Sequence, residues 1–416
     1  MITRRGVGII AVAIAVFFLA STTRVGWVHL GDAVLWGVVL LSLAIPWVSA
    51  PGLKVHRSLA SSEVTGGIGP IEGDDVPVTL TLENRWWLPR FLVSVSYTVV
   101  AAGSERTQRS IFFWTSPKRS NQSQSPFNLE RRGQHTFGEA VVEITGPFGL
   151  FRRRRRFQMT HGVLAYPAWQ PMRRMGLMES MAGEHEGRRK ARTGTDASGT
   201  RPYVPGDSYR TIHWRNSARS GRLAVREFDT WNDRSVALAI DTANARGDSP
   251  ESSIDYAARI AASCARVIEQ EGGTVSVITA TGTSPEFLAW PGVMEHLARM
   301  ESDAGKVSSL ARDISNLHSG KRLMAFLTAG SDAEAAAVCA AARRGISAVT
   351  VMFIPDDHED VADGADVAML RQAGVPVVLC APGGLDAAIR EIETGISSAS
   401  ASTPSFHLAG QAQVAA

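Results

Sequence analysis

The chain has 416 residues, 44% of them hydrophobic and 20% charged, so it is long enough for two or three folded domains and is not disordered as a whole. Its 43 Lys and Arg residues nearly balance its 40 Asp and Glu residues, and the net charge of +3 does not by itself indicate a nucleic-acid partner.

Two uncharged stretches near the N-terminus, Gly6–Thr23 and Ala33–Leu53, are each close to the roughly 20 residues that cross a bilayer. Joined by a linker over Arg24–Asp32, they predict a transmembrane helical hairpin within residues 1–57. A cleaved signal peptide is the other interpretation, but no small-x-small cleavage site follows and a second span comes directly after. Basic residues flank both outer ends, so the positive-inside rule places both termini in the cytoplasm. These residues are Arg4, Arg5, Lys54 and Arg57.

Residues 58–168 alternate in short apolar runs that are separated by Gly, Pro, Asn or Ser, without a helical period of useful length. This pattern predicts an antiparallel β-sandwich-like domain. The predicted strands are 76–82, 92–100, 110–114 and 140–145.

An unbroken run of five arginines, Arg152–Arg156, follows Phe151. Like charges diverge most easily into water, so a solvated edge or loop is the simplest interpretation. Contact with anionic lipid is the functional alternative, because a polybasic segment near such a surface gains on the order of 1 kcal/mol per basic side chain.

A second basic cluster precedes residue 201, and neither cluster has aromatic residues among its charges. A single-strand binder needs such stacking platforms, and no known nucleic-acid-binding motif occurs. The sequence therefore predicts no nucleic-acid partner. The second cluster is Arg188, Arg189, Lys190 and Arg192.

The segment 169–234 contains the densest pattern of the chain, RPYVPGDSYRTIHWRNSARSGRLAVREF over 201–228. Pro205 and Gly206 predict a tight turn, Asp207 an N-cap, and 208–219 a short helix that ends at Gly221. A strand over 223–228 should follow, with Leu223 and Val225 on one face.

Residues 201–229 contain six arginines and only three carboxylates, those of Asp207, Glu227 and Asp229. Guanidinium–carboxylate pairs can form an internal lattice. The excess of cations favours the alternative, an acidic partner surface. The candidate partner-binding residues are Arg201, Tyr203, Asp207, Arg210, His213, Trp214, Arg219, Arg222, Arg226 and Glu227.

The same residues carry a resemblance, because their spacing is similar to the signature of the bacterial domain of unknown function 58 family. The stretches RRGQHTFG, GPFGLF and AYP, within 131–167, resemble the segment that precedes the signature in that family. Gly146 stands where the family usually has Asp. The resemblance implies a membrane-anchored protein with a von Willebrand factor A-like domain, often found alongside a MoxR-type AAA+ ATPase.

From residue 235 to 395 strand and helix patterns alternate. The strands, apolar enough to be buried on both faces, predict a doubly wound parallel α/β domain. Together with its place after the signature, this domain resembles the von Willebrand factor A-like domain. The predicted strands are 235–242, 274–280, 322–330, 348–355 and 375–383, with helices at 253–270 and 332–343.

Three cysteines, Cys264, Cys339 and Cys380, lie among apolar residues of this domain. Their odd number and the lack of CxxC spacing fit neither a disulfide framework nor a zinc site. The sequence predicts buried, reduced thiols in a reducing compartment. Residues 396–416 are small, polar and unpatterned, which predicts a disordered tail.

A metal site of the von Willebrand A type uses Asp-x-Ser-x-Ser after the first strand, but here both serine positions are alanine and only Asp241 keeps its oxygen ligand. Thr328 is present in a later loop without an adjacent Asp; Asp332 lies further on. A hard cation wants about six oxygen ligands, so we expect a degenerate site and no bound metal. Asp241 should instead cap the following helix or pair with a cation.

Catalysis has no evident location in the sequence. Ser208, His213 and Asp207 supply the residue types of a hydrolase, yet His213 should pack on the predicted helix. No GxSxG elbow, P-loop, GxGxxG or HExxH occurs, so we expect no cofactor.

We therefore expect a non-catalytic binding or scaffold module at the cell membrane, working with a MoxR-type AAA+ ATPase as the resemblance implies. A membrane-bound hydrolase of envelope or phosphorylated substrates is the second hypothesis. Self-association within a membrane complex is the third.

Overall fold

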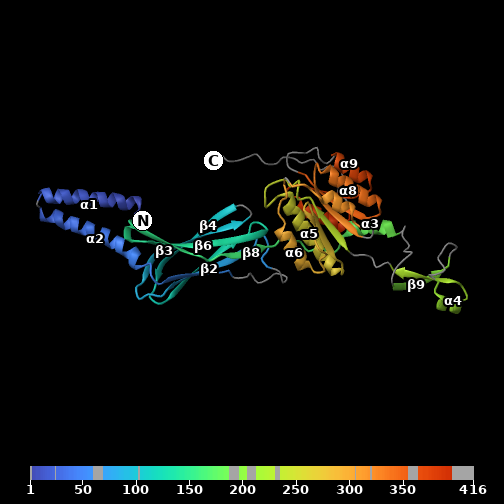
Figure 1. Ribbon diagram of the computed structural model, residues 1–416, viewed down its shortest axis with the longest axis horizontal. Helices are drawn as coiled ribbons and strands as arrows, with labels where there is room; N and C mark the ends of the chain where they lie inside the picture. Colours follow the sequence, from blue (N-terminus) through green and yellow to red (C-terminus); the bar gives the residue numbers. More distant parts are fainter. Residues whose placement is uncertain are drawn as a thin grey trace, which may run out of the picture. The chain divides into compact units, whose positions relative to one another are not determined.

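Most of the chain is described by the computed structural model, which divides into two units, residues 1–168 and 169–416 (Figure 1). The described residues are 2–23, 25–59, 69–101, 104–186, 196–203, 212–229, 235–304, 306–318, 321–354 and 364–395. The predicted basic cluster at 188–192 and the predicted tail at 396–416 lie outside them.

Two apolar helices begin the first unit, α1 (Arg4–Thr23) and α2 (Gly26–Val48). Both are long and apolar enough to cross a membrane. Only 17% of each apolar window is buried, and Phe18 and Trp27 are among the exposed side chains. A core helix of a soluble protein buries such side chains. The helices are thus compatible with a membrane location.

The connection between these helices is shorter than the sequence predicts. The linker was expected over Arg24–Asp32, but α2 begins at Gly26 and includes Asp32, whose side chain is buried. A single Asp costs a helix only a fraction of 1 kcal/mol, so this charge does not end it.

Eight strands follow in two antiparallel sheets that share one core. The first sheet has the order β1-β2-β5, with β1 at Leu53–Leu59, β2 at Asp75–Asn84 and β5 at Ser120–Asn128. The second has the order β4-β3-β6-β7, and β8 also pairs with β6. Its strands are β3 (Arg90–Ala101), β4 (Ser104–Thr115), β6 (Gly133–Thr145), β7 (Arg152–Phe157) and β8 (His161–Ala165).

Alternation along the strands produces this core, because successive side chains of a strand point to opposite faces. In β2 every second residue is buried, including Val78, Leu80 and Leu82. Residues of the other sheet, such as Val95 and Phe137, complete the same cluster. Each of the four strands predicted in this region lies within an observed strand. The arginine run forms the edge strand β7, as the edge interpretation predicts.

The second unit begins with α3 (Gly176–Glu186), β9 (Asp196–Pro202), α4 (Trp214–Ser220) and β10 (Ala224–Asp229). β9 and β10 form a two-stranded antiparallel sheet. β9 was not predicted, and the structure describes α4 only from Trp214 onward.

The remaining strands of this unit form a six-stranded sheet in the order β13-β12-β11-β14-β15-β16. β13 is antiparallel to β12, and the other neighbouring pairs are parallel. The strands are β11 (Val236–Ile240), β12 (Val275–Thr279), β13 (Gly282–Thr283), β14 (Arg322–Thr328), β15 (Ser347–Phe353) and β16 (Val377–Cys380).

Helices lie on both faces of this sheet (Figure 1). One layer contains α5 (Ser253–Gln270), α6 (Trp290–Arg299) and α10 (Leu385–Thr394). The other contains α7 (Leu310–Ser315), α8 (Asp332–Arg343) and α9 (Ala365–Gln372). α5 and α8 have the predicted bounds. The α/β alternation predicted for residues 235–395 is present, with mixed α and β content.

Candidate functional site

The described part of the signature segment is held together by main-chain hydrogen bonds to β10 and to the residues that precede it. The Tyr203 N–H donates to the Leu223 carbonyl at 2.8 Å, and the His213 N–H donates to the Ala224 carbonyl at 2.8 Å. Ile212 forms an isolated antiparallel bridge with Val225. These contacts bring residues 11 to 20 positions apart in sequence side by side.

The side chain of Ser217 connects α4 to the start of β10 by hydrogen bonds. Its hydroxyl is buried, donates to the His213 carbonyl at 3.1 Å and accepts a hydrogen bond from the Ala224 N–H at 2.9 Å. A Ser hydroxyl can both donate and accept, so one side chain connects helix and strand.

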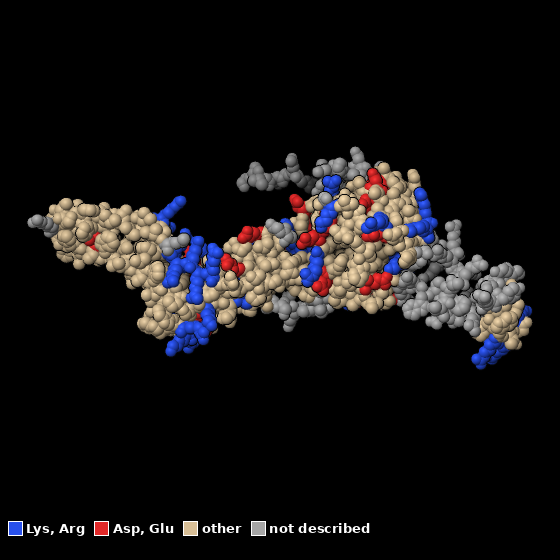
Figure 2. Space-filling model, viewed as in Figure 1, with Lys and Arg blue, Asp and Glu red and all other residues tan. Residues whose placement is uncertain are grey.

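The opposite side of α4 is exposed and basic. Trp214, at its first position, has 65% of its surface exposed. Arg215 and Arg219 on the helix are also exposed, as is Arg222 after it. Figure 2 shows the basic residues of this segment at one end of its described surface. An exposed Trp with exposed arginines close to it in sequence has the composition that dominates the energetics of many protein interfaces.

The structure describes the other predicted partner-binding residues only in part. Asp207 and Arg210 lie outside the described residues. Arg201, Arg226 and Glu227 belong to β9 and β10, which pair with each other, but the positions of their side chains are not described. The predicted internal lattice therefore stays a prediction, since the carboxylates it needs are among these residues.

Two local predictions are corrected in this segment. His213 lies before α4 rather than on it, because its N–H is used in the bond to Ala224. Leu223 does not share a buried face with Val225: it precedes β10 and is 43% exposed, whereas Val225 is 4% exposed. Its carbonyl accepts the Tyr203 N–H instead.

A second set of polar residues gathers at the carboxyl end of β11, next to the neighbouring strand β14. Asp241 is buried, and its carboxylate accepts hydrogen bonds from Asn244 and from Ser331. The Asn244 N–H lies 3.0 Å from Oδ1, the Asn244 amide nitrogen 3.0 Å from Oδ2, and the Ser331 hydroxyl 2.5 Å from Oδ2.

This arrangement corrects the expected role of Asp241. The carboxylate neither caps the next helix nor pairs with a cation; α5 is capped by Ser252, which forms a capping box with Asp255. Asp332 begins α8, and its neighbour Ser331 reaches Asp241 in its place. Within the described ranges, no group of three or more His, Cys, Asp or Glu residues could hold a metal ion.

Beside Asp241, a cavity of about 530 Å³ opens at the carboxyl ends of β14, β15 and β16. In open α/β sheets this edge is the usual place for ligands. Its lining combines polar and apolar groups from Arg246, Glu251, Tyr256, Thr328, Phe353 and Cys380. Burial raises the pKa of the Cys380 thiol to about 12, so the thiolate that a nucleophile requires is scarce at neutral pH.

All three cysteines are free and buried, as predicted. Burial also raises the pKa of Cys264 to about 12. Of the three residues in the hydrolase hypothesis only His213 is described, since Asp207 and Ser208 lie outside the described residues, so this hypothesis stays a prediction.

Sequence reasoning singled out Asp241 but missed Asn244 and Ser331. Asn244 lies in the same loop as Asp241. Because Asn side chains often form hydrogen bonds within turns, its position could have suggested a contact with Asp241. Ser331 is 90 positions away from Asp241, and only the pairing of β11 with β14 brings them together.

Comparison with known proteins relates the chain to a family without an assigned function. Residues 199–363 match the family described as protein of unknown function DUF58. The uncharacterized protein YeaD of Bacillus subtilis (strain 168) is 24% identical over 212 residues, which cover 47% of this chain and 52% of YeaD. The chain thus spans about half the length of this curated relative. Both matches support the DUF58 family.

Solved structures with partial similarity have low scores. A putative late embryogenesis abundant protein covers 33% of this chain, with 87% of its own length, 10% identity and a TM-score of 0.21. Spo0M, a sporulation control protein from Bacillus subtilis, covers 36% of this chain, with 58% of its own length, 13% identity and a TM-score of 0.17. Scores this low do not assign a fold to either unit.

Proposed function

We propose that this protein is a non-catalytic, membrane-anchored binding module whose signature segment contacts an acidic protein surface. The observation that carries the proposal is the exposed Trp214, together with the exposed Arg215, Arg219 and Arg222 of the same short segment. A large aromatic side chain excludes water at the centre of an interface, and guanidinium groups pair with carboxylates in two parallel hydrogen bonds.

A Trp that packs into the core of its own unit is buried and uses its indole N–H in a hydrogen bond. Trp290 of α6 illustrates the contrast: it is 2% exposed, and its indole N–H donates to the Ala262 carbonyl at 2.9 Å. Trp214 has 65% of its surface in contact with solvent. The cost of exposing so large an apolar surface favours a role in binding.

The α/β part of the second unit is, in this proposal, of the von Willebrand factor A type. Its support is the strand order with β11 and β14 adjacent, and Asp241 at the end of the first strand. Hydrogen bonds from Asn244 and Ser331 use the carboxylate that a metal would need, so binding at this edge would not depend on a cation.

The anchor is the α1–α2 hairpin, with both termini in the cytoplasm. The basic residues at its two ends support this orientation. The free, buried cysteines of the second unit fit a reducing compartment. Nothing but the family resemblance points to the partner, a MoxR-type AAA+ ATPase.

Capture of the tagged full-length protein from gently solubilised membranes tests the proposal. The native protein, Trp214→Ala and Arg219→Glu are compared with and without a non-hydrolysable ATP analogue, and co-purified proteins are identified by mass spectrometry. Arg371→Glu is the matched control, because Arg371 is exposed in the last turn of α9 as Arg219 is in the last turn of α4.

We expect nucleotide-dependent recovery of the ATPase with the native protein and with Arg371→Glu, and a loss of at least tenfold with the two signature variants. Equal recovery with all four folded proteins would show that the signature surface is not the binding site. Absence of any ATPase, with hydrolysis of envelope or phosphorylated substrates by the purified protein, would favour the hydrolase hypothesis instead.

A further inference from the structure

The edge strand β7 contacts the end of α2 through one face. Arg153 lies over the Trp47 ring, with its guanidinium carbon 4.6 Å from the ring centroid, and its Nη1 donates to the Trp47 carbonyl at 3.4 Å. Arg155 Nη1 donates to the Ala50 carbonyl at 3.3 Å. Trp47 is the penultimate residue of α2, so two arginines of β7 are fixed at the end of this apolar helix.

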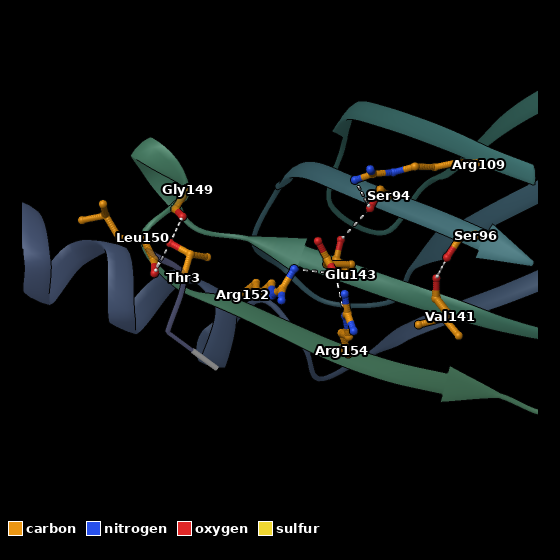
Figure 3. A network of polar contacts seen from close by, with 10 residues as sticks. All are labelled: Thr3, Ser94, Ser96, Arg109, Val141, Glu143, Gly149, Leu150, Arg152 and Arg154. Atoms are coloured by element: carbon orange, nitrogen blue, oxygen red, sulfur yellow. Dashed lines mark hydrogen bonds and ion pairs between the residues drawn. The ribbon is translucent and has the colours of Figure 1, made fainter. Parts of the chain in front are cut away.

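α1 begins at the same place. The Thr3 hydroxyl donates to the carbonyls of Gly149 and Leu150, at 2.7 and 3.0 Å (Figure 3). A Cβ on Gly6 would lie 2.4 Å from the Leu150 carbonyl oxygen, which shows how closely the first turn of α1 approaches this loop. β7 follows the loop directly, so it lies where one apolar helix begins and the other ends.

The other face of β7 carries more positive charge than its neighbours neutralise. Arg154 bonds to Glu143 at 2.7 Å and Arg152 lies 3.9 Å from the same carboxylate, as Figure 3 shows. Arg156 lies 3.5 Å from Glu139. On this face three arginines against two carboxylates leave an excess of one positive charge, to which Arg153 and Arg155 on the face toward α2 add two more.

These charges face solvent. The side chains of Arg154 and Arg156 are 52% and 76% exposed, and Arg4 and Arg5 in the first turn of α1 are exposed as well. Figure 2 shows basic side chains gathered over the base of the helical hairpin. Trp47, 63% exposed, adds an aromatic side chain of the kind enriched at membrane interfaces.

We propose that β7, together with Arg4 and Arg5, binds the phosphate groups of anionic lipids at the membrane surface. A guanidinium group matches a phosphate with two parallel hydrogen bonds, and the hairpin holds the strand at the depth of the headgroups. A binding site for a water-soluble anion would not have to lie at the ends of two apolar helices. The inference rests on the membrane anchorage proposed above.

The test uses the full-length protein in detergent and native mass spectrometry during titration with phosphatidylglycerol, which is anionic, or phosphatidylcholine, which is zwitterionic. Arg154→Gln/Arg156→Gln is the test variant. Arg106→Gln is the matched control, because Arg106 lies in the same sheet, is 58% exposed and pairs with Glu130. It belongs to β4 and lies opposite Val99, near the end of β3 that is farther from the helices.

We expect the native protein and Arg106→Gln to bind phosphatidylglycerol more tightly than phosphatidylcholine. The double variant should lose on the order of fivefold in phosphatidylglycerol affinity for each arginine removed. Equal affinity of the native protein and the double variant for phosphatidylglycerol would overturn the proposal. So would full displacement of the lipid by millimolar inorganic phosphate, which would identify a soluble anion as the ligand.

Failure of the anchorage itself gives a different result. Protein that is not anchored would be recovered in the soluble fraction after alkaline extraction of native membranes. Anchored protein without lipid selectivity would stay in the membrane fraction and yet show no preference in the titration.

Discussion

The carboxylate of Asp241 accepts a hydrogen bond from the hydroxyl of Ser331, with 2.5 Å between Oδ2 and Oγ, although the two residues are 90 positions apart in sequence. The side-chain amide of Asn244 donates to both carboxylate oxygens as well. Protein donors thus satisfy a buried carboxylate at the carboxyl edge of the six-stranded sheet.

These hydrogen bonds predict that divalent metals do not change the stability of the protein. Magnesium at millimolar concentration, or EDTA, should leave the melting temperature of the native protein unchanged. Asp241→Ala should cost about 2 to 3 kcal/mol of unfolding free energy, because Ser331 and Asn244 are left without their acceptor. A rise in melting temperature with magnesium that disappears in Asp241→Ala would show instead that the site binds the metal.

Arg57 supports a second prediction, on the stability of the sandwich. It lies in β1 and was counted among the basic residues that flank the second apolar segment, and its side chain is buried between the sheets. Its guanidinium group donates to the carbonyls of Phe137, Gly138 and Met159 and lies over the Tyr97 ring. Desolvation by burial lowers the pKa of Arg57 from its ordinary value.

Arg57→Met keeps most of the side-chain volume but leaves three carbonyls without a donor. We expect it to lower the unfolding free energy of the sandwich by about 3 kcal/mol. Pulse proteolysis of the full-length protein in increasing urea measures the change. Arg106→Met, which removes an exposed ion pair, should cost less than about 1 kcal/mol; equal losses in the two variants would contradict the structural role of Arg57.

His135 predicts how the sandwich responds to pH. Its ring is 3% exposed, Nε2 bonds to the Arg131 carbonyl at 2.8 Å, and Nδ1 is buried without a hydrogen-bond partner in the described part of the chain. Desolvation by burial, opposed in part by the Arg131 bond, lowers the pKa of His135 below its ordinary value. The unfolded chain therefore binds more protons than the folded chain between the two pKa values.

The stability that neutral His135 provides is complete above the unfolded pKa of about 6.5 and is lost as the pH falls toward the lower folded pKa. Amide hydrogen exchange in β6 and β8, corrected for intrinsic rates, should therefore become faster from pH 7.5 to 5.5. His135→Gln should remove most of this acceleration, whereas His56→Gln, at an exposed position, should not. An unchanged pH response in His135→Gln would show that another group controls it.

Local signals predicted the helices α5 and α8 to the residue. α5 has a Ser252 cap and an apolar period, and α8 is rich in alanine. The strands β11, β12, β14 and β15 were predicted because they are apolar throughout and buried on both faces.

Elements that depend on distant partners were left open by the sequence or were not predicted. The arginines of β7 have no preference that distinguishes a loop from an edge strand, and it is pairing with β6 that selects the strand. The contact between Asp241 and Ser331 could not be predicted for the same reason. It depends on which strands are neighbours in the sheet, and the spacing of residues along the chain does not give the strand order.

Gly146 carries the last prediction, because it lies where the loop before β7 meets α2. A Cβ at this position would lie 2.3 Å from the carbonyl oxygen of Ser42, closer than real Cβ atoms approach any backbone oxygen. The family pattern usually has Asp here, so the close contact depends on a glycine that departs from that pattern. Gly146→Ala should separate the loop from the helix, and Gly146→Asp should do so further.

The expected result is faster hydrogen exchange in residues 145–151 and at the end of α2, with a melting temperature lowered by several degrees, as about 1 to 3 kcal/mol of overpacking implies. Gly8→Ala is the control, since nothing lies within 4 Å of a Cβ at that position in α1. If Gly146→Ala and Gly8→Ala behave alike, the hairpin is not packed against this loop. The arginines of β7 would then have no fixed depth relative to the membrane, and their lipid selectivity would have to arise from charge alone.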